Sequence, residues 1–216
     1  MISFNNVSMR YADGFEALKS VSFQLADGEM AFLTGHSGAG KSTLLKLITI
    51  SERPASGEIL FKGLNLARVL GKNIYKVRRD IGVVYQNHRL LPEKNVFENV
   101  ALPLRIIGTD YRELAKRVRA AISKVGLSGS EKKFPNSLSS GEQQRVGIAR
   151  AVVSKPSLLL ADEPTGNLDS ISAETVFQLL TQLAKSTGVG ALIATHNLDL
   201  AKRMDRIVRL ENGLII

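Results

Sequence analysis

A glycine-rich segment at residues 35–42 carries the clearest chemical signal in this sequence of 216 residues. It fits the phosphate-binding pattern G-x-x-x-x-G-K-[ST], and it lies between a predicted strand and a predicted helix. Glycines let backbone N–H groups turn toward phosphate oxygens, and the helix N-terminus adds a favourable dipole. We expect Lys41 to reach the β- and γ-phosphates and Ser42 to give a hydroxyl to Mg²⁺. The predicted nucleotide-binding residues are Gly35, His36, Ser37, Gly38, Ala39, Gly40, Lys41, Ser42 and Thr43.

An Asp-Glu pair follows the apolar run Leu158-Leu159-Leu160-Ala161. Asp162 is expected to hold Mg²⁺ through water ligands of the metal. Glu163 is placed to polarise the attacking water. Without other motifs, an Asp-Glu pair of this kind would be interpreted as the solvent-exposed end of a strand. Beside a phosphate loop, the pair predicts the catalytic half of an ATPase site.

Two further polar residues, Gln86 and His196, also follow short apolar runs. A single Gln or His after a strand is most often structural. However, the phosphate loop, Gln86, the acidic pair and His196 all come just after the carboxyl end of a predicted strand. In open α/β sheets, ligands bind in the crevice along that edge. The sequence therefore predicts that these four segments form one site.

The elements that must position this site are short apolar runs separated by helical periodicity. The runs predicted as buried parallel strands are 30–34, 81–85, 157–161, 191–195 and 207–210. Residues 1–30 alternate in polarity and, with 56–63, predict an antiparallel β flank. Residues 87–154 predict a helical subdomain. The expected fold is α/β, a single domain over 1–216 with a mostly parallel core sheet.

Composition excludes several classes of protein. No cysteine is present, so disulfides and thiolate metal sites are excluded, and no apolar run is long enough to span a bilayer. The start of the chain lacks the pattern of a secretory signal, which fits a cytosolic protein. The formal charge of +9 would suit nucleic acid, an anionic membrane surface or an acidic partner. The basic clusters are not interleaved with aromatic residues, so nucleic acid is not favoured.

The segment Leu138-Ser139-Ser140-Gly141-Glu142-Gln143 precedes a helix predicted to run to about residue 154. A serine cap and a turn glycine would explain it without function. It also resembles the signature loop of ATP-binding cassette (ABC) proteins. That resemblance implies a P-loop NTPase fold and a homodimer formed on ATP binding, in which Ser139, Gly141 and Glu142 contact the nucleotide held by the other subunit. Ser140 stands where glycine is typical, which leaves the hydrolysis rate open.

The same resemblance implies roles for residues elsewhere in the chain. Gln86 would contact Mg²⁺ and the attacking water, and His196 would bind the γ-phosphate and orient Glu163. Asp169, in the segment Gly166-Asn167-Leu168-Asp169, would communicate across the dimer while also capping a helix. Tyr11 resembles the aromatic residue that stacks on adenine, although a tyrosine at a strand end is often simply packed.

A closer likeness is to the cell-division ATP-binding proteins of the FtsE type. It rests on three stretches, 32–48, 81–86 with 89–92, and 161–169, of which the last is shared with lipoprotein-release and macrolide-export relatives. The likeness implies an FtsX-type integral membrane subunit as partner, peripheral association with the cytoplasmic face of the bacterial inner membrane, and control of cell-wall hydrolysis. Residues 87–104 would form the groove for that subunit, with ordinary packing an equal alternative.

Other functions remain open from the sequence. An ATPase subunit for lipoprotein release is the nearest alternative. A cassette protein acting on ribosomes or DNA is more distant, because such proteins usually carry two cassettes or a long coiled-coil insertion. Ser140 also leaves room for a nucleotide-dependent clamp that scarcely hydrolyses.

Overall fold

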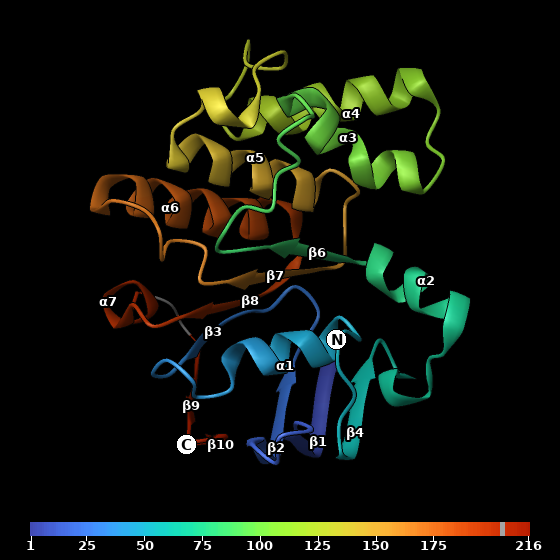
Figure 1. Cartoon of the computed structure of the whole chain (residues 1–216), viewed down its shortest axis with the longest axis vertical. Helices are drawn as coiled ribbons and strands as arrows, with labels where there is room; N and C mark the ends of the chain where they lie inside the picture. Colours follow the sequence, from blue (N-terminus) through green and yellow to red (C-terminus); the bar gives the residue numbers. More distant parts are fainter. Residues whose placement is uncertain (204–205) are drawn as a thin grey trace.

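The computed structural model describes residues 1–203 and 206–216. It contains a six-stranded sheet of order β10-β9-β3-β8-β7-β6 and a four-stranded sheet of order β2-β1-β4-β5 (Figure 1). The strands are β1 Ile2–Arg10, β2 Glu16–Leu25, β3 Met30–Thr34, β4 Ser56–Phe61, β5 Leu64–Asn65, β6 Ile81–Val84, β7 Leu158–Asp162, β8 Gly190–Thr195, β9 Ile207–Glu211 and β10 Leu214–Ile215. The helices are α1 Lys41–Ile48, α2 Ile74–Arg79, α3 Val96–Ile106, α4 Tyr111–Lys124, α5 Ser140–Val152, α6 Ser170–Thr187 and α7 Leu198–Ala201, with short 3-10 turns η1 Leu66–Arg68, η2 Gly71–Asn73 and η3 Pro135–Ser137.

The five predicted core strands are confirmed to within two residues at each end. β3 pairs in parallel with β8 and β9, and β7 lies in parallel between β6 and β8. The predicted antiparallel strands are also confirmed, since β1 pairs with both β2 and β4. The sequence did not predict β5 and β10, because strands of two residues have no measurable alternation.

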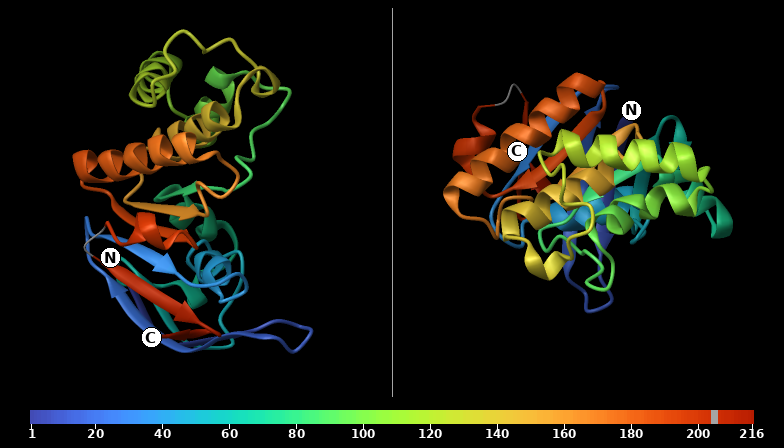
Figure 2. Two further views of the ribbon diagram at one scale, coloured as in Figure 1. Left: turned by 90° about the vertical axis from the view of Figure 1, so that its left-hand side faces the viewer. Right: turned by 90° about the horizontal axis from the view of Figure 1, so that it is seen from above.

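The central sheet separates two hydrophobic cores, and its strands supply both because successive side chains point to opposite faces. Leu159 and Ala161 of β7 pack with α3, α4, α5 and α6. Leu158 and Leu160 pack with α1 and the antiparallel sheet. Figure 2 shows this order of layers, with the helices α3–α5 at one end of the molecule and the antiparallel strands at the other.

Residues 87–154 contain α3, α4, η3 and α5 and no strand, in a stretch that is described throughout. α3 and α5 each begin with a capping box, formed by Asn95 with Glu98 and by Ser139 with Glu142. α4 buries Leu114, Val118 and Ile122 along one face. Within the described residues, none of the helices has the length and apolar character that crossing a membrane requires.

Candidate nucleotide site

The four predicted site segments meet at one edge of the central sheet. Gly35 follows β3, Gln86 follows β6 after one residue, Asp162 ends β7 and His196 follows β8. These four strands are parallel neighbours, so their carboxyl ends lie together. A cavity of about 510 Å³ opens at this edge. Its lining residues are Phe15, Ser37, Gly38, Gly40, Lys41, Ser42, Thr43, Gln86, Glu163 and His196.

The phosphate loop needs glycine at position 40 for two physical reasons. Gly40 caps α1 with φ of 108°, a conformation that L side chains rarely adopt. A Cβ atom there would also lie 2.6 Å from the Ala17 carbonyl oxygen and 2.9 Å from Leu18 Cδ2. The loop can therefore approach β2 closely, and α1 begins at Lys41 with its N-terminus toward the cavity.

The Lys41 side chain lies inside this loop. Its Nζ donates hydrogen bonds to the carbonyl oxygens of Gly35 at 2.7 Å and His36 at 3.1 Å, and only 7% of the side chain is exposed. It also lies 3.4 Å from Glu163 Oε1. The Lys41 ammonium is thus held inside the loop by one carboxylate and two carbonyl oxygens. Phosphate oxygens would be equally good acceptors for its hydrogen bonds. His36 turns its ring to its neighbour, with Nδ1 2.7 Å from the Ser37 carbonyl oxygen.

Two oxygen ligands suited to Mg²⁺ come together from opposite ends of the site. Ser42 Oγ donates a hydrogen bond of 3.0 Å to Asp162 Oδ1 across 120 positions of sequence. Burial raises the pKa of Asp162, and the charge of Glu163 adds to this, whereas the hydrogen bond from Ser42 opposes it. No group of three His, Cys, Asp or Glu residues within the described ranges could hold a metal by itself. A hydroxyl and one carboxylate fit Mg²⁺, which takes its other ligands from phosphate and water.

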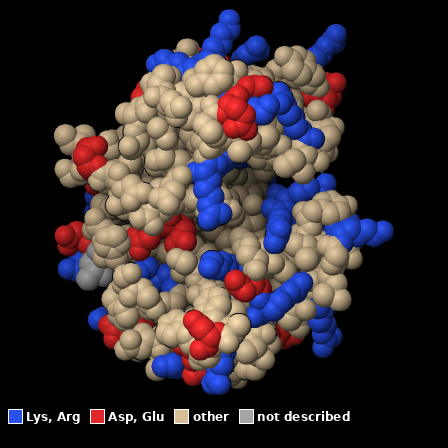
Figure 3. All heavy atoms as spheres, viewed as in Figure 1, with Lys and Arg blue, Asp and Glu red and all other residues tan. Residues whose placement is uncertain are grey.

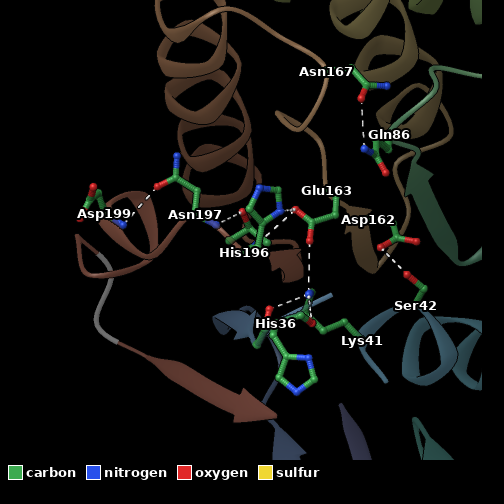
Figure 4. A network of polar contacts seen from close by, with 12 residues as sticks. His36, Lys41, Ser42, Gln86, Asp162, Glu163, Asn167, His196, Asn197 and Asp199 are labelled. Carbon is green, nitrogen blue, oxygen red and sulfur yellow. Dashed lines mark hydrogen bonds and ion pairs between the residues drawn. The ribbon is translucent and has the colours of Figure 1, made fainter. Parts of the chain in front are cut away.

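Glu163 and His196 form a second polar pair at the same edge (Figure 4). His196 Nδ1 lies 2.8 Å from Glu163 Oε2, and the His196 backbone N–H donates to the same oxygen at 3.2 Å. Glu163 has φ of 47°, a strained conformation for a residue other than glycine. Its own N–H donates to the Ala194 carbonyl oxygen at 2.9 Å, which fixes this backbone against β8. One carboxylate is therefore aimed into the site with Lys41 at one oxygen and His196 at the other.

Gln86 is connected to the loop after the acidic pair. Its Nε2 donates to Asn167 Oδ1 at 3.1 Å (Figure 4). Asn167 Nδ2 in turn donates to Asn87 Oδ1 at 2.7 Å. The role of Asn167 as a bridge could not be predicted, because an amide that bridges two segments has no signature in the order of residues. Asp169 accepts hydrogen bonds from the N–H groups of Ile171 at 3.1 Å and Ser172 at 3.0 Å, as predicted for a helix cap. Hydrogen bonds from Ser172 lower the pKa of Asp169.

The signature segment lies away from the phosphate loop of its own chain, since none of its residues lines the cavity. Ser139 Oγ accepts from the Glu142 N–H at 3.3 Å, and Glu142 Oε2 accepts from the Ser139 N–H at 2.8 Å. This backbone hydrogen bond lowers the pKa of Glu142, so the carboxylate is committed to the helix cap. A Cβ on Gly141 would lie 3.1 Å from Ser172 Oγ, which places the segment beside the start of α6.

The aromatic residue that lines the cavity is Phe15, which the sequence analysis did not select. Its side chain is 55% exposed, whereas Tyr11 is partly buried and is absent from the lining. Tyr11 Oη lies 3.0 Å from Thr43 Oγ1, and the Lys46 ammonium lies 5.8 Å from the centre of its ring. Tyr11 therefore lies against α1, with its hydroxyl on the first turn of that helix.

Comparisons with known proteins agree with this geometry. The family model of the ABC transporter matches residues 18–166. The chain is 50% identical to the cell division ATP-binding protein FtsE of Escherichia coli K12, with 99% of this chain and 96% of that protein covered. It is 43% identical to the lipoprotein-releasing system ATP-binding protein LolD 1 of Rhodospirillum rubrum, with 100% and 97% covered.

Solved structures show the same fold. The dimeric structure of the ATP-binding cassette MJ0796, in a post-hydrolysis state bound to ADP and Pi, superposes with a TM-score of 0.91 at 35% identity and covers 100% of this chain and 96% of that one. The cassette cbiO1 of Clostridium perfringens gives a TM-score of 0.90 at 31% identity, with 100% and 86% covered. By its matching family model, its near full-length relatives and its phosphate loop, this chain belongs to the ABC transporter family and is one of its ATPase subunits.

Proposed function

We propose that this chain drives an FtsX-type membrane subunit in bacterial cell division, as a homodimer bound to the cytoplasmic face of the inner membrane. The observation that carries the proposal is the 50% identity to FtsE over nearly the whole of both chains. A second relative described as FtsE, from Bacillus subtilis, is 42% identical with 100% of this chain and 97% of that protein covered.

In the proposed hydrolysis step, the side chains at the sheet edge divide the work. Lys41 binds the β- and γ-phosphates, and Ser42, Asp162 and Gln86 hold Mg²⁺, which neutralises phosphate charge when bound. Glu163 accepts the proton of the attacking water, and His196 fixes the orientation of that carboxylate. Tyr11 remains our proposal for adenine stacking.

The second half of each site would come from the other subunit. Ser139, Gly141 and Glu142 lie outside the cavity of their own chain, which supports a role toward a nucleotide held by the other subunit. Their position at the N-terminus of α5 favours binding of an anion such as the γ-phosphate. Asp169, at the start of the neighbouring α6, is proposed to communicate across the same interface. The solved relatives described as dimeric support this arrangement.

A second cavity, of about 740 Å³, offers a docking groove for the membrane subunit. It lies between α2, the edge strand β6 and the carboxyl ends of α3 and α5. Of the expected segment 87–104 it includes only Leu102 and Pro103, so most of that segment is elsewhere. The reason is packing, because Val100 is buried and Leu90 and Phe97 lie against the helical core.

The lining of this groove suits a helix that is partly apolar and partly acidic. Lys72, Arg78, Arg79 and Arg150 line it together with apolar side chains, and no Asp or Glu within the described residues does so. Ile106, at its rim, is 77% exposed. Figure 3 shows Lys and Arg side chains gathered beside the hollow between the helical end of the molecule and the rest. Exposed apolar side chains next to cationic ones are typical of a surface that binds another protein.

Co-purification with an FtsX-type subunit tests the proposed partner, and one groove variant tests the surface. We expect Ile106→Glu to abolish co-purification, because it puts a carboxylate into the apolar part of the contact. Leu64→Glu is the matched control, since Leu64 is 49% exposed on β5 and is not in the groove. Equal binding by both variants would contradict the groove, and no binding by the unmodified chain would contradict the partner.

Lipoprotein release is the second candidate, favoured by the 43% identity to LolD 1 across the full chain. Genetic rescue separates the two functions. The cell-division proposal requires that the chain restore division in cells lacking FtsE. Rescue of a lipoprotein-release defect instead would show that the second candidate is correct.

A further inference from the structure

The turn that follows Gln86 is held in an unusual conformation. His88 has φ of 53° and Arg89 has φ of 48°, so two consecutive residues with side chains are left-handed. This conformation is unfavourable for a residue that carries a Cβ atom. Such a pair persists only where surrounding contacts stabilise it, and here the turn begins two residues beyond a side chain assigned to the ATP site.

Arg150, near the carboxyl end of the signature helix α5, provides those contacts. Its Nη1 donates to the Arg89 carbonyl oxygen at 2.7 Å and its Nη2 to the His88 carbonyl oxygen at 2.7 Å. Burial lowers the pKa of this guanidinium, and none of the described carboxylates forms an ion pair with it. The two carbonyl oxygens of one turn are therefore what compensates its burial.

A second side chain of α5 fixes the same turn from both ends. Gln144 is fully buried, and its Oε1 is hydrogen bonded to the His88 ring while its Nε2 donates to the Tyr85 carbonyl oxygen at 3.2 Å. Gln86 thus lies between two anchored residues, Tyr85 and His88. The backbone of Gln86 is set by α5, and its side chain is set by Asn167.

We propose that Arg150 is a positioning residue for ATP hydrolysis, acting through Gln86 by holding the left-handed turn at His88 and Arg89. The proposal rests on the role of Gln86 given under the proposed function. It also connects the two cavities, because Arg150 and Tyr85 line the docking groove and the Arg89 guanidinium lies 4.2 Å from the centre of the Tyr85 ring. A segment bound in the groove would therefore touch the side chain that sets Gln86.

The test is steady-state ATPase kinetics of Arg150→Lys, with Arg145→Lys as matched control. Lysine keeps the charge but has no planar guanidinium, in which two separate nitrogens, Nη1 and Nη2, each donate to one carbonyl oxygen of the turn. Arg145 lies on the same helix and also donates to two successive carbonyl oxygens, those of Val125 at 3.1 Å and Gly126 at 3.3 Å, in a turn away from the ATP site. We expect Arg150→Lys to lower kcat by about tenfold and to change KM for ATP less than about twofold, because a displaced Gln86 would weaken stabilisation of the transition state more than binding of ATP. The control should keep the wild-type kcat.

A double variant separates positioning from general loss of structure. If Arg150 acts through Gln86, adding Arg150→Lys to Gln86→Ala lowers kcat no further, whereas independent effects multiply. Every variant is compared at a temperature where circular dichroism shows it fully folded, and Arg150→Gln, which keeps one donor, gives a second substitution. Wild-type kcat for Arg150→Lys, an equal loss in Arg145→Lys, or multiplying losses would each overturn the proposal. Full activity of Gln86→Ala alone would instead overturn the role of Gln86.

Discussion

Glu163→Gln should stop turnover while strengthening ATP binding, because the carboxylate has two opposed effects in this site. As proton acceptor it is worth about 10²- to 10⁴-fold in kcat, and an amide of the same shape cannot replace it. As the neighbour of Lys41 at 3.4 Å it competes with the phosphates for the ammonium. The Coulomb attraction between the Lys41 ammonium and the Glu163 carboxylate is about 5 kcal/mol at an effective dielectric constant of about 20. The cost of desolvating these two charges offsets most of it. If about 1.4 kcal/mol remains, Kd for ATP falls about tenfold in the variant.

The assay combines phosphate release with binding of a fluorescent ATP analogue and size-exclusion chromatography. The variant should release phosphate at least about a hundred times more slowly, bind the analogue more tightly and stay dimeric in ATP. Weaker binding by the variant would refute the competition between Glu163 and phosphate. A wild-type chain that is as inactive as the variant would refute turnover and favour a nucleotide-dependent clamp.

Three further predictions follow from the geometry. Asp162→Asn should raise the melting temperature of the nucleotide-free chain by at most about 2 °C. Burial raises the pKa of Asp162 in the folded chain, so its charged form destabilises the fold above that pKa, and the neutral amide removes this effect. Calorimetry checks the melting temperature, and the stabilisation by MgATP should be lost in the variant. Lys41→Ala and Ser139→Arg chains, each inactive alone, should recover about a quarter of wild-type activity when mixed, because half of the dimers are mixed and each of these has one intact site; no recovery would contradict a site shared between subunits. Ser140→Gly should raise kcat about twofold or more if the serine side chain restrains backbone approach to phosphate; an unchanged kcat would show that it does not.

Local patterns were enough to predict the parts of the site whose residues are consecutive. The predicted nucleotide-binding residues of the phosphate loop lie within nine consecutive positions, 35–43. Glycine at position 40 is required by its positive φ and by the close approach of β2. The core strands could be predicted because strands buried on both faces are apolar at every position. Their parallel arrangement then brought Gln86, Asp162 and His196 to one edge without any knowledge of side-chain contacts.

What the tertiary structure alone decided are the contacts between distant segments. The Ser42 to Asp162 hydrogen bond, the bridge from Asn167 to Gln86 and the place of Phe15 in the cavity depend on side-chain direction across elements far apart in the sequence. The proposed groove shares only Leu102 and Pro103 with the predicted segment 87–104, since the buried face of α3 turns its apolar side chains inward. Sequence order determines which groups are available and on which sheet edge they lie, while packing of the helices on that sheet determines which of them touch.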